Sequence, residues 1–305
     1  MIITNETLSS LRTMVRGEFQ SRLTGLKTQA LYKTLVTIIQ SNSSSNTYGW
    51  LGKFPQMIEW VGERVIKDMK EMAYELFNKK YEATLGIDRA DIEDDNLGIY
   101  RTLSQSYADE FVSFCNRKVF ALLSGGFEGL CYDGQPFFDA EHPVYPNTDG
   151  TGTAESVSNI QGDVAATGTP WFLVNLSGVL KPFILQERIA PEMESITDTK
   201  NDHVFMNDEY LYGIRYRGNF GYGFWQQAVA SKETLNAENY KAAVAKMKAF
   251  KRDGGDKLGI VPTHLVVGSS LESAGREVVE KENLTGGESN INYHTTELVV
   301  SPWME

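Results

Sequence analysis

The sequence has little cysteine and no long apolar run. Only two cysteines occur in the 305 residues, Cys115 and Cys131, and they form no CxxC pair. This scarcity argues against a disulfide-stabilised secreted fold and favours a reduced, intracellular setting. No stretch of about 18 apolar residues exists, so no membrane-spanning helix is expected. The N-terminus lacks the basic and apolar regions of a signal peptide, so export by that route is not expected.

Catalytic signatures are also missing. The sequence contains no Walker A motif, no GxSxG elbow, no GxGxxG turn and no HExxH pair, so no cofactor or metal is expected. One local cluster combines Asp133, Asp139 and Glu141 with His142. Its prolines favour a polar turn. A hydrolase with its site near His142 is the alternative function that this cluster leaves open.

Basic residues are fewer than acidic residues, and they are unevenly distributed along the chain. The formal net charge is −11, which makes the chain a poor candidate for binding nucleic acid. The first 40 residues carry +3, which leaves −14 for the remainder, and their charged residues are Arg12, Arg16, Arg22, Lys27, Lys33, Glu6 and Glu18. This segment is either a solvated helix face or an arm that docks on an acidic neighbour. On the second interpretation, Arg12 and Arg16 are candidate inter-subunit contacts.

Helical periodicity is clearest over residues 97–124, where apolar residues recur at spacings of three and four until Gly125-Gly126. A second helix is predicted from Asn236, a plausible N-cap, to about residue 252. Ser269 to Glu272 has the pattern of a capping box and predicts a third helix.

Strand patterns are spread over the second half of the chain. They predict strands near residues 171–174, 182–186, 210–225, 263–267 and 298–300. Glycines within 210–225 are expected to bend or bulge the strand. The elements do not alternate regularly, so the pattern favours an α+β fold with a mixed or antiparallel sheet.

Residues 47–95 have the character of a long, charged hairpin. Residues 81–88 alternate with period two and predict a strand, and residues 64–77 are its predicted partner. A lone hairpin is marginal in water, so it must lie either on its own core or on a neighbour. If it lies on a neighbour, the candidate contact residues are Trp50, Phe54 and Trp60.

Several ordered blocks resemble the major head proteins of Mu-like tailed bacteriophages. They include NTYGWLGKFP at 46–55, CYDGQPFFD at 131–139, KPFILQER at 181–188 and GYGFWQ at 221–226. The blocks are short, but they keep one order and span nearly the whole chain.

The resemblance implies the Hong Kong 97-type phage capsid fold. That fold has an N-terminal arm, an extended E-loop hairpin, a long spine helix, and peripheral and axial domains. The expected divisions are an arm over 1–42, an E-loop over 43–95, spine helix and peripheral domain over 96–228, an axial domain over 229–290 and a C-terminal strand over 291–305.

The resemblance also implies a function without catalysis. Copies of the chain would form pentamers and hexamers of an icosahedral head that encloses double-stranded DNA without sequence-specific binding. The implied partners are a scaffolding protein, a head protease, a portal and decoration proteins, with no membrane. The implied location is the virion, after assembly in the host bacterial cytoplasm. Another phage structural protein, a tail or decoration component, is the alternative within the same class.

Overall fold

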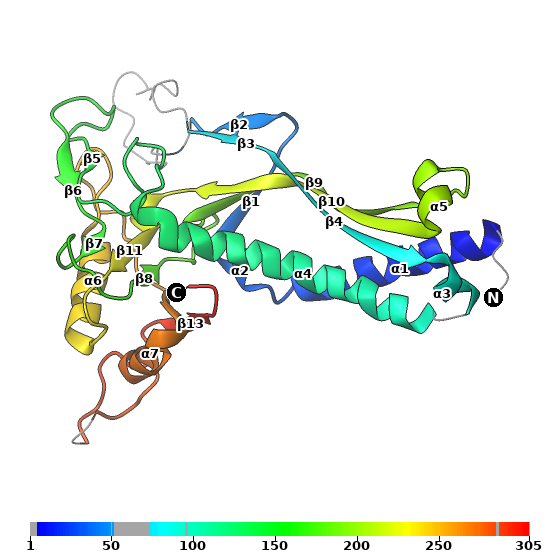
Figure 1. The fold of residues 1–305 in the computed structure, drawn as a ribbon. Helices are drawn as coiled ribbons and strands as arrows, with labels where there is room; N and C mark the ends of the chain where they lie inside the picture. The colour runs from blue at the N-terminus through cyan, green and yellow to red at the C-terminus, as the bar shows by residue number, and fades with distance from the viewer. Residues whose placement is uncertain (1–4, 50, 52–73, 95–96, 285–286, 305) are drawn as a thin grey trace.

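The computed structural model describes residues 5–49, 51, 74–94, 97–284 and 287–304. Within them, the molecule is elongated, with one long helix running across it (Figure 1). A four-stranded sheet lies along that helix. A five-stranded sheet with two further helices occupies one end (Figure 1). None of the helices in these ranges is long and apolar enough to cross a membrane.

The helices and strands alternate irregularly along the chain. The helices are α1 (Asn5–Lys27), α2 (Leu31–Leu35), α3 (Arg89–Glu93), α4 (Leu97–Ser124), α5 (Asp202–Asn207), α6 (Ala237–Ala249) and α7 (Glu272–Val279), with 3-10 turns η1 (Gly125–Phe127), η2 (Trp225–Gln227) and η3 (Ser269–Leu271). The strands are β1 (Val36–Gln40), β2 (Ser45–Thr47), β3 (Glu75–Phe77), β4 (Lys79–Asp88), β5 (His142–Val144), β6 (Glu155–Val157), β7 (Ile160–Gln161), β8 (Trp171–Val174), β9 (Phe183–Ile196), β10 (Glu209–Tyr222), β11 (Ala228–Ser231), β12 (His264–Gly268) and β13 (Glu297–Ser301).

The long helix α4 matches the periodicity predicted for residues 97–124. Ala108, Cys115 and Val119 are fully buried on the face that meets the rest of the fold. The predicted stop is also confirmed, because the helix ends at Ser124 and a 3-10 turn follows. A Cβ atom on Gly126 would lie 2.6 Å from the ring of Phe138, so only glycine fits where the chain leaves the helix.

The four-stranded sheet has the order β1-β9-β10-β4, with β1 parallel to β9 and the other pairs antiparallel. The mixed sheet predicted from the sequence is therefore confirmed. The partner predicted for residues 81–88 is wrong, because β4 pairs with β10 and the short strand β3 pairs with β2. The physical reason is burial: Tyr81 and Leu85 on β4 pack onto the core instead of facing a free-standing hairpin.

A bulge interrupts the pairing of β9 with β10 around Arg217 and Gly218. A Cβ atom on Gly218 would lie 2.5 Å from the carbonyl oxygen of Gln186. The predicted glycine-dependent irregularity is thus present, and it lets the two long strands bend while staying paired.

The second sheet has the order β13-β12-β8-β11-β7, with α6 against β11 and β7 and α7 against β12 and β13. Asn236 caps α6 as predicted, since its side-chain oxygen accepts from the backbone N–H of Asn239 at 2.9 Å. The capping box predicted at Ser269 is wrong. Residues 269–271 form a 3-10 turn, and the N–H of Glu272 bonds the carbonyl of Ser269, so no side chain caps α7.

Candidate inter-subunit surfaces

The N-terminal helix α1 lies along α4 of its own chain (Figure 1). One face of α1 is buried at helical spacing, and its residues are Leu8, Leu11, Val15, Phe19 and Leu23. Polar bonds flank this face: Ser104 donates to the carbonyl of Val15 at 2.5 Å, and Arg22 pairs with Asp109 at 2.8 Å. The first part of the expected arm is therefore packed on the spine helix of the same subunit.

Arg12 and Arg16 lie along the edge of this buried face of α1, each directly after a buried residue in the sequence. Both side chains are exposed. Neither forms an ion pair with a carboxylate of the described ranges, whereas Glu18 on the flank pairs with Arg101 at 2.7 Å. These two arginines remain available to an acidic partner. The other predicted contacts, Trp50, Phe54 and Trp60, lie outside the described residues.

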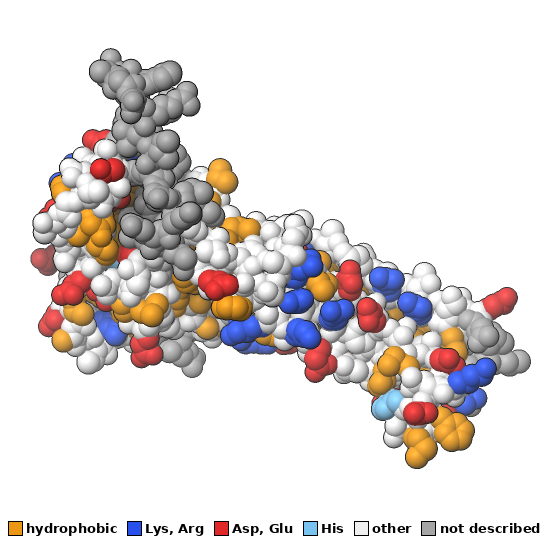
Figure 2. All heavy atoms as spheres, turned by 90° about the horizontal axis from the view of Figure 1, so that it is seen from above, with side chains coloured by type: hydrophobic (Ala, Val, Ile, Leu, Met, Phe, Trp, Pro, Cys, Tyr) orange, Lys and Arg blue, Asp and Glu red, His pale blue; other side chains and the backbone are white. Residues whose placement is uncertain are grey.

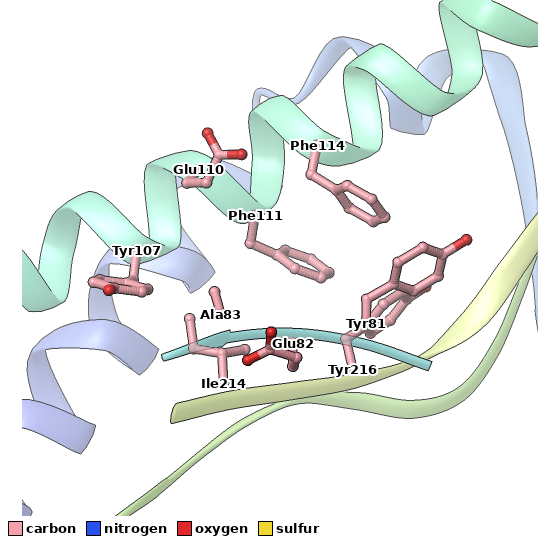
Figure 3. Close-up of a pocket in the computed structure, with 9 residues that line it drawn as sticks. All are labelled: Tyr81, Glu82, Ala83, Tyr107, Glu110, Phe111, Phe114, Ile214 and Tyr216. Carbon is pink, nitrogen blue, oxygen red and sulfur yellow. The ribbon is translucent and has the colours of Figure 1, made fainter. Parts of the chain in front are cut away.

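A small aromatic groove of about 150 Å³ opens between α4 and the strands β4 and β10. Figure 3 shows Phe111 and Phe114 pointing from the helix toward Tyr81 and Tyr216 on the strands, with Glu110 pointing away from the rings. The rings of Tyr81 and Phe114 meet edge to face at 4.7 Å between centroids.

Charge around this groove is balanced within the subunit. Lys118 lies 5.7 Å above the ring of Tyr81, and Glu110 pairs with Arg117 at 2.5 Å. Burial raises the pKa of the Tyr81 hydroxyl, so Tyr81 stays neutral at physiological pH. Helical and strand spacing in the sequence does not predict this groove, since periodicity indicates which face is buried but not a gap in its packing.

The polar cluster near His142 is closed. Asp133 accepts from the Cys131 thiol at 2.9 Å and bonds His142 Nδ1 at 2.7 Å. The side chains of His142 and Asp133 are 0% and 2% exposed, and the ring of Trp225 covers the imidazole. Cys131, Asp133 and His142 are the donor types that a metal ion could use. In this arrangement, however, Cys131 and His142 both form hydrogen bonds with Asp133, and Asp133 also accepts from the N–H of Gln135.

The protonation of the cluster fits a structural role. Burial would raise the pKa of Asp133, but the hydrogen bond and charge interaction with His142 outweigh it and lower that pKa. Burial and the nearby Asp133 raise the pKa of the Cys131 thiol, so it stays protonated and donates. Asp139 and Glu141, the other members of the predicted cluster, are bonded elsewhere: the N–H of Asp139 donates to Asn159 Oδ1, and the carboxylate of Asp139 accepts from the N–H of Glu141. A substrate has no access to the imidazole, so the geometry argues against a hydrolytic centre here.

The model of the family described as Mu-like prophage major head subunit gpT matches residues 8–304. The chain belongs to this family. The chain is 44% identical to the major capsid protein of Escherichia phage Mu over 292 residues, which cover 96% of this chain and 95% of that protein. The members are structural subunits of phage heads, so the predicted family and function are confirmed.

Solved shells show the same fold. The chain matches a subunit of the procapsid of bacteriophage JBD30 with a TM-score of 0.89 and 46% identity, covering 99% of this chain and 100% of that one. The JBD30 capsid decorated with minor capsid protein trimers matches with a TM-score of 0.74 and 31% identity, covering 90% and 91%. The α+β phage capsid fold predicted from the sequence is therefore confirmed.

As a gpT-family subunit, the chain must present surfaces to neighbours. One exposed apolar site is the turn of α5 between β9 and β10, where Phe205 and Met206 are 78% and 77% exposed. Figure 2 shows hydrophobic side chains gathered at that end of the molecule, beside a histidine. The described residues thus bury most large apolar side chains and leave a smaller number exposed.

Proposed function

We propose that this chain assembles into pentamers and hexamers that close an icosahedral head around packaged double-stranded DNA. The observation that carries the proposal is the match of almost the whole chain to a procapsid subunit, with no large segment left over on either side. The net charge of −11 supports a shell that encloses DNA without binding it tightly, because tight binding to phosphates needs clustered Lys and Arg.

The proposal includes no catalytic step. The strongest polar cluster of the described ranges, around His142, is buried and internally bonded. Its role is to hold the 131–142 loop against η2. This supports a structural protein over the hydrolase alternative.

Contacts between subunits are proposed through the arm and the E-loop. Arg12 and Arg16 are exposed at the edge of the α1 face that is buried in the subunit. They would meet carboxylates of a neighbour, while Trp50, Phe54 and Trp60 supply apolar contacts from the loop. Because β4 belongs to the four-stranded sheet, a deletion test of the loop must spare residues 75–88.

We also propose how the fold divides. The five-stranded sheet with α6 and α7 would form the axial domain, built mainly from residues 229–290 with strands β7, β8 and β13 added. The four-stranded sheet and α4 would form the peripheral domain. A scaffolding protein, a head protease and a portal are further proposed partners, with assembly in the host cytoplasm. The decorated JBD30 capsid supports a decoration partner.

Electron microscopy of the purified chain, alone and co-expressed with its scaffolding protein, tests the function. Icosahedral shells or capsomers are the expected result. Tubes would instead indicate a tail component, and a uniform monomer with hydrolytic activity would indicate an enzyme. A variant with Trp50, Phe54 and Trp60 changed to Ser should keep the wild-type circular dichroism spectrum and fail to form shells. Normal shells from that variant would remove the E-loop from the proposal.

A further inference from the structure

The outer face of α6 carries a groove that nothing within the subunit fills. Its volume is about 360 Å³, and its lining includes Tyr240, Val244, Val261 and Pro262. Val261 is 48% exposed, an unusual position for a valine beside other apolar side chains. An apolar groove of this kind on a subunit of a shell is a candidate contact surface.

Two lysines flank the apolar lining. Lys241 and Lys248 also line the groove and are two turns apart on α6, on the same side of the helix. Both are exposed, and neither pairs with any carboxylate in the described part of the chain. An occupant of this groove should therefore be apolar with acidic residues beside it.

A ridge with that chemistry follows α7. Ile291 is 72% exposed and Tyr293 is 39% exposed. Glu282 and Glu288 lie close by in sequence, and the backbone N–H of Asn290 bonds the carbonyl of Glu282, which holds the segment together. Both carboxylates are exposed, and the ion pairs of α7 involve other residues of the described ranges.

The groove and the ridge lie on different sides of one segment. Asn292 lines the groove, together with Thr295 and Thr296, whereas the flanking Ile291 and Tyr293 do not. Tyr240 fixes this wall, because its hydroxyl bonds the hydroxyls of Thr295 and Thr296 at 2.8 and 2.9 Å. This part of the chain therefore offers two different apolar surfaces, one flanked by lysines and one by glutamates. Head-to-tail association into closed rings requires such a pair, since each subunit must use one surface on each neighbour.

We infer that the ridge of Ile291 and Tyr293 on one copy of this chain docks in the α6 groove of the next copy. Glu282 and Glu288 then face Lys241 and Lys248 across the contact. The inference rests on the proposed function, because it gives the ring contact of a self-assembling shell. It assigns the occupant of the groove to a second copy of the chain.

Charge reversal tests the pairing. Lys248→Glu alone and Glu288→Lys alone each place like charges together and should raise the concentration for half-maximal assembly roughly 10-fold or more, since tenfold corresponds to about 1.4 kcal/mol. The double variant K248E/E288K should return assembly toward wild type. Sedimentation velocity and negative-stain microscopy measure assembly under conditions in which the wild type forms capsomers. Circular dichroism confirms that each variant is folded.

Ile291→Ser provides an uncharged test of the ridge, with Val179→Ser, at a valine that is 90% exposed on the loop before β9, as the matched control. The ridge variant should assemble poorly and the control normally. Single reversals that assemble like wild type would overturn the inference. Defective single variants without rescue in the double variant would show that the two surfaces bind something other than each other. Failure of the wild type itself to assemble would instead contradict the proposed function.

Discussion

The imidazole ring of His142 lies face to face with the indole of Trp225, with centroids 4.1 Å apart and planes 8° apart. The same imidazole bonds Asp133 at 2.7 Å through Nδ1. One histidine thus joins the loop before β5 to the η2 turn between β10 and β11. One face of the ring and its Nδ1 edge are both used, so the polar residues that resemble a reactive site serve to connect two parts of the chain.

Replacing His142 should destabilise the fold. The variant His142→Phe keeps a ring to stack on Trp225 but removes the hydrogen bond to Asp133, which is 2% exposed. The free energy of unfolding should fall by about 1–3 kcal/mol, because a buried carboxylate loses a partner. Urea unfolding measures it. The matched control is His203→Phe, at a histidine that is 39% exposed, which should change little. Equal losses for both variants would contradict the structural role of His142.

Acid should weaken the fold through Asp133. Its pKa is lowered in the folded chain from the usual 3.8. A carboxyl group with a lowered folded pKa stabilises the fold above its unfolded pKa, and that stabilisation is lost as the pH falls through the folded value. The difference in unfolding free energy between wild type and Asp133→Asn should therefore be largest near neutral pH and shrink below pH 3.8. A difference that stays constant across the titration would exclude this contribution.

The packing of α1 on α4 should depend on apolar contacts more than on charge. Phe19 is 1% exposed, so Phe19→Ala should cost about 3–5 kcal/mol of unfolding free energy. The pair of Arg22 and Asp109 is 48% and 46% exposed, so Arg22→Ala should cost less than about 1 kcal/mol. Thermal or urea unfolding compares the two variants. A larger loss for Arg22→Ala would mean that the ion pair fixes the helix.

Replacing each of two glycines with alanine should change the free energy of unfolding in opposite directions. A Cβ atom at Gly218 would meet the carbonyl oxygen of Gln186 at 2.5 Å, so Gly218→Ala should destabilise by about 1–3 kcal/mol. Gly17 lies within α1 with nothing within 4 Å of a Cβ, so Gly17→Ala should stabilise by about 0.5–1 kcal/mol. Differential scanning calorimetry reports both changes as shifts of Tm. An unchanged or raised Tm for Gly218→Ala would show that the bulge accommodates a side chain.

Local patterns in the sequence were sufficient for the long helix and for α6. The apolar spacing over 97–124 and the N-cap at Asn236 involve residues within a few positions of one another, so their physics is contained in the local chain. The capping box predicted at Ser269 is wrong although its residues are equally close in the chain. Backbone bonds of a 3-10 turn satisfied the same N–H groups, and a residue pattern does not reveal which solution is used.

The ordered motifs of the sequence were enough to predict the family, and local spacing was enough to predict the elements whose hydrogen bonds are local. The pairing of β4 with β10, the packing of α1 on its own α4 and the contact of Asp133, His142 and Trp225 became visible in the folded chain alone. Each of these contacts joins residues far apart in the chain, and each depends on which faces are buried together. Burial is a property of the whole fold, so no local pattern of residues could specify the partner.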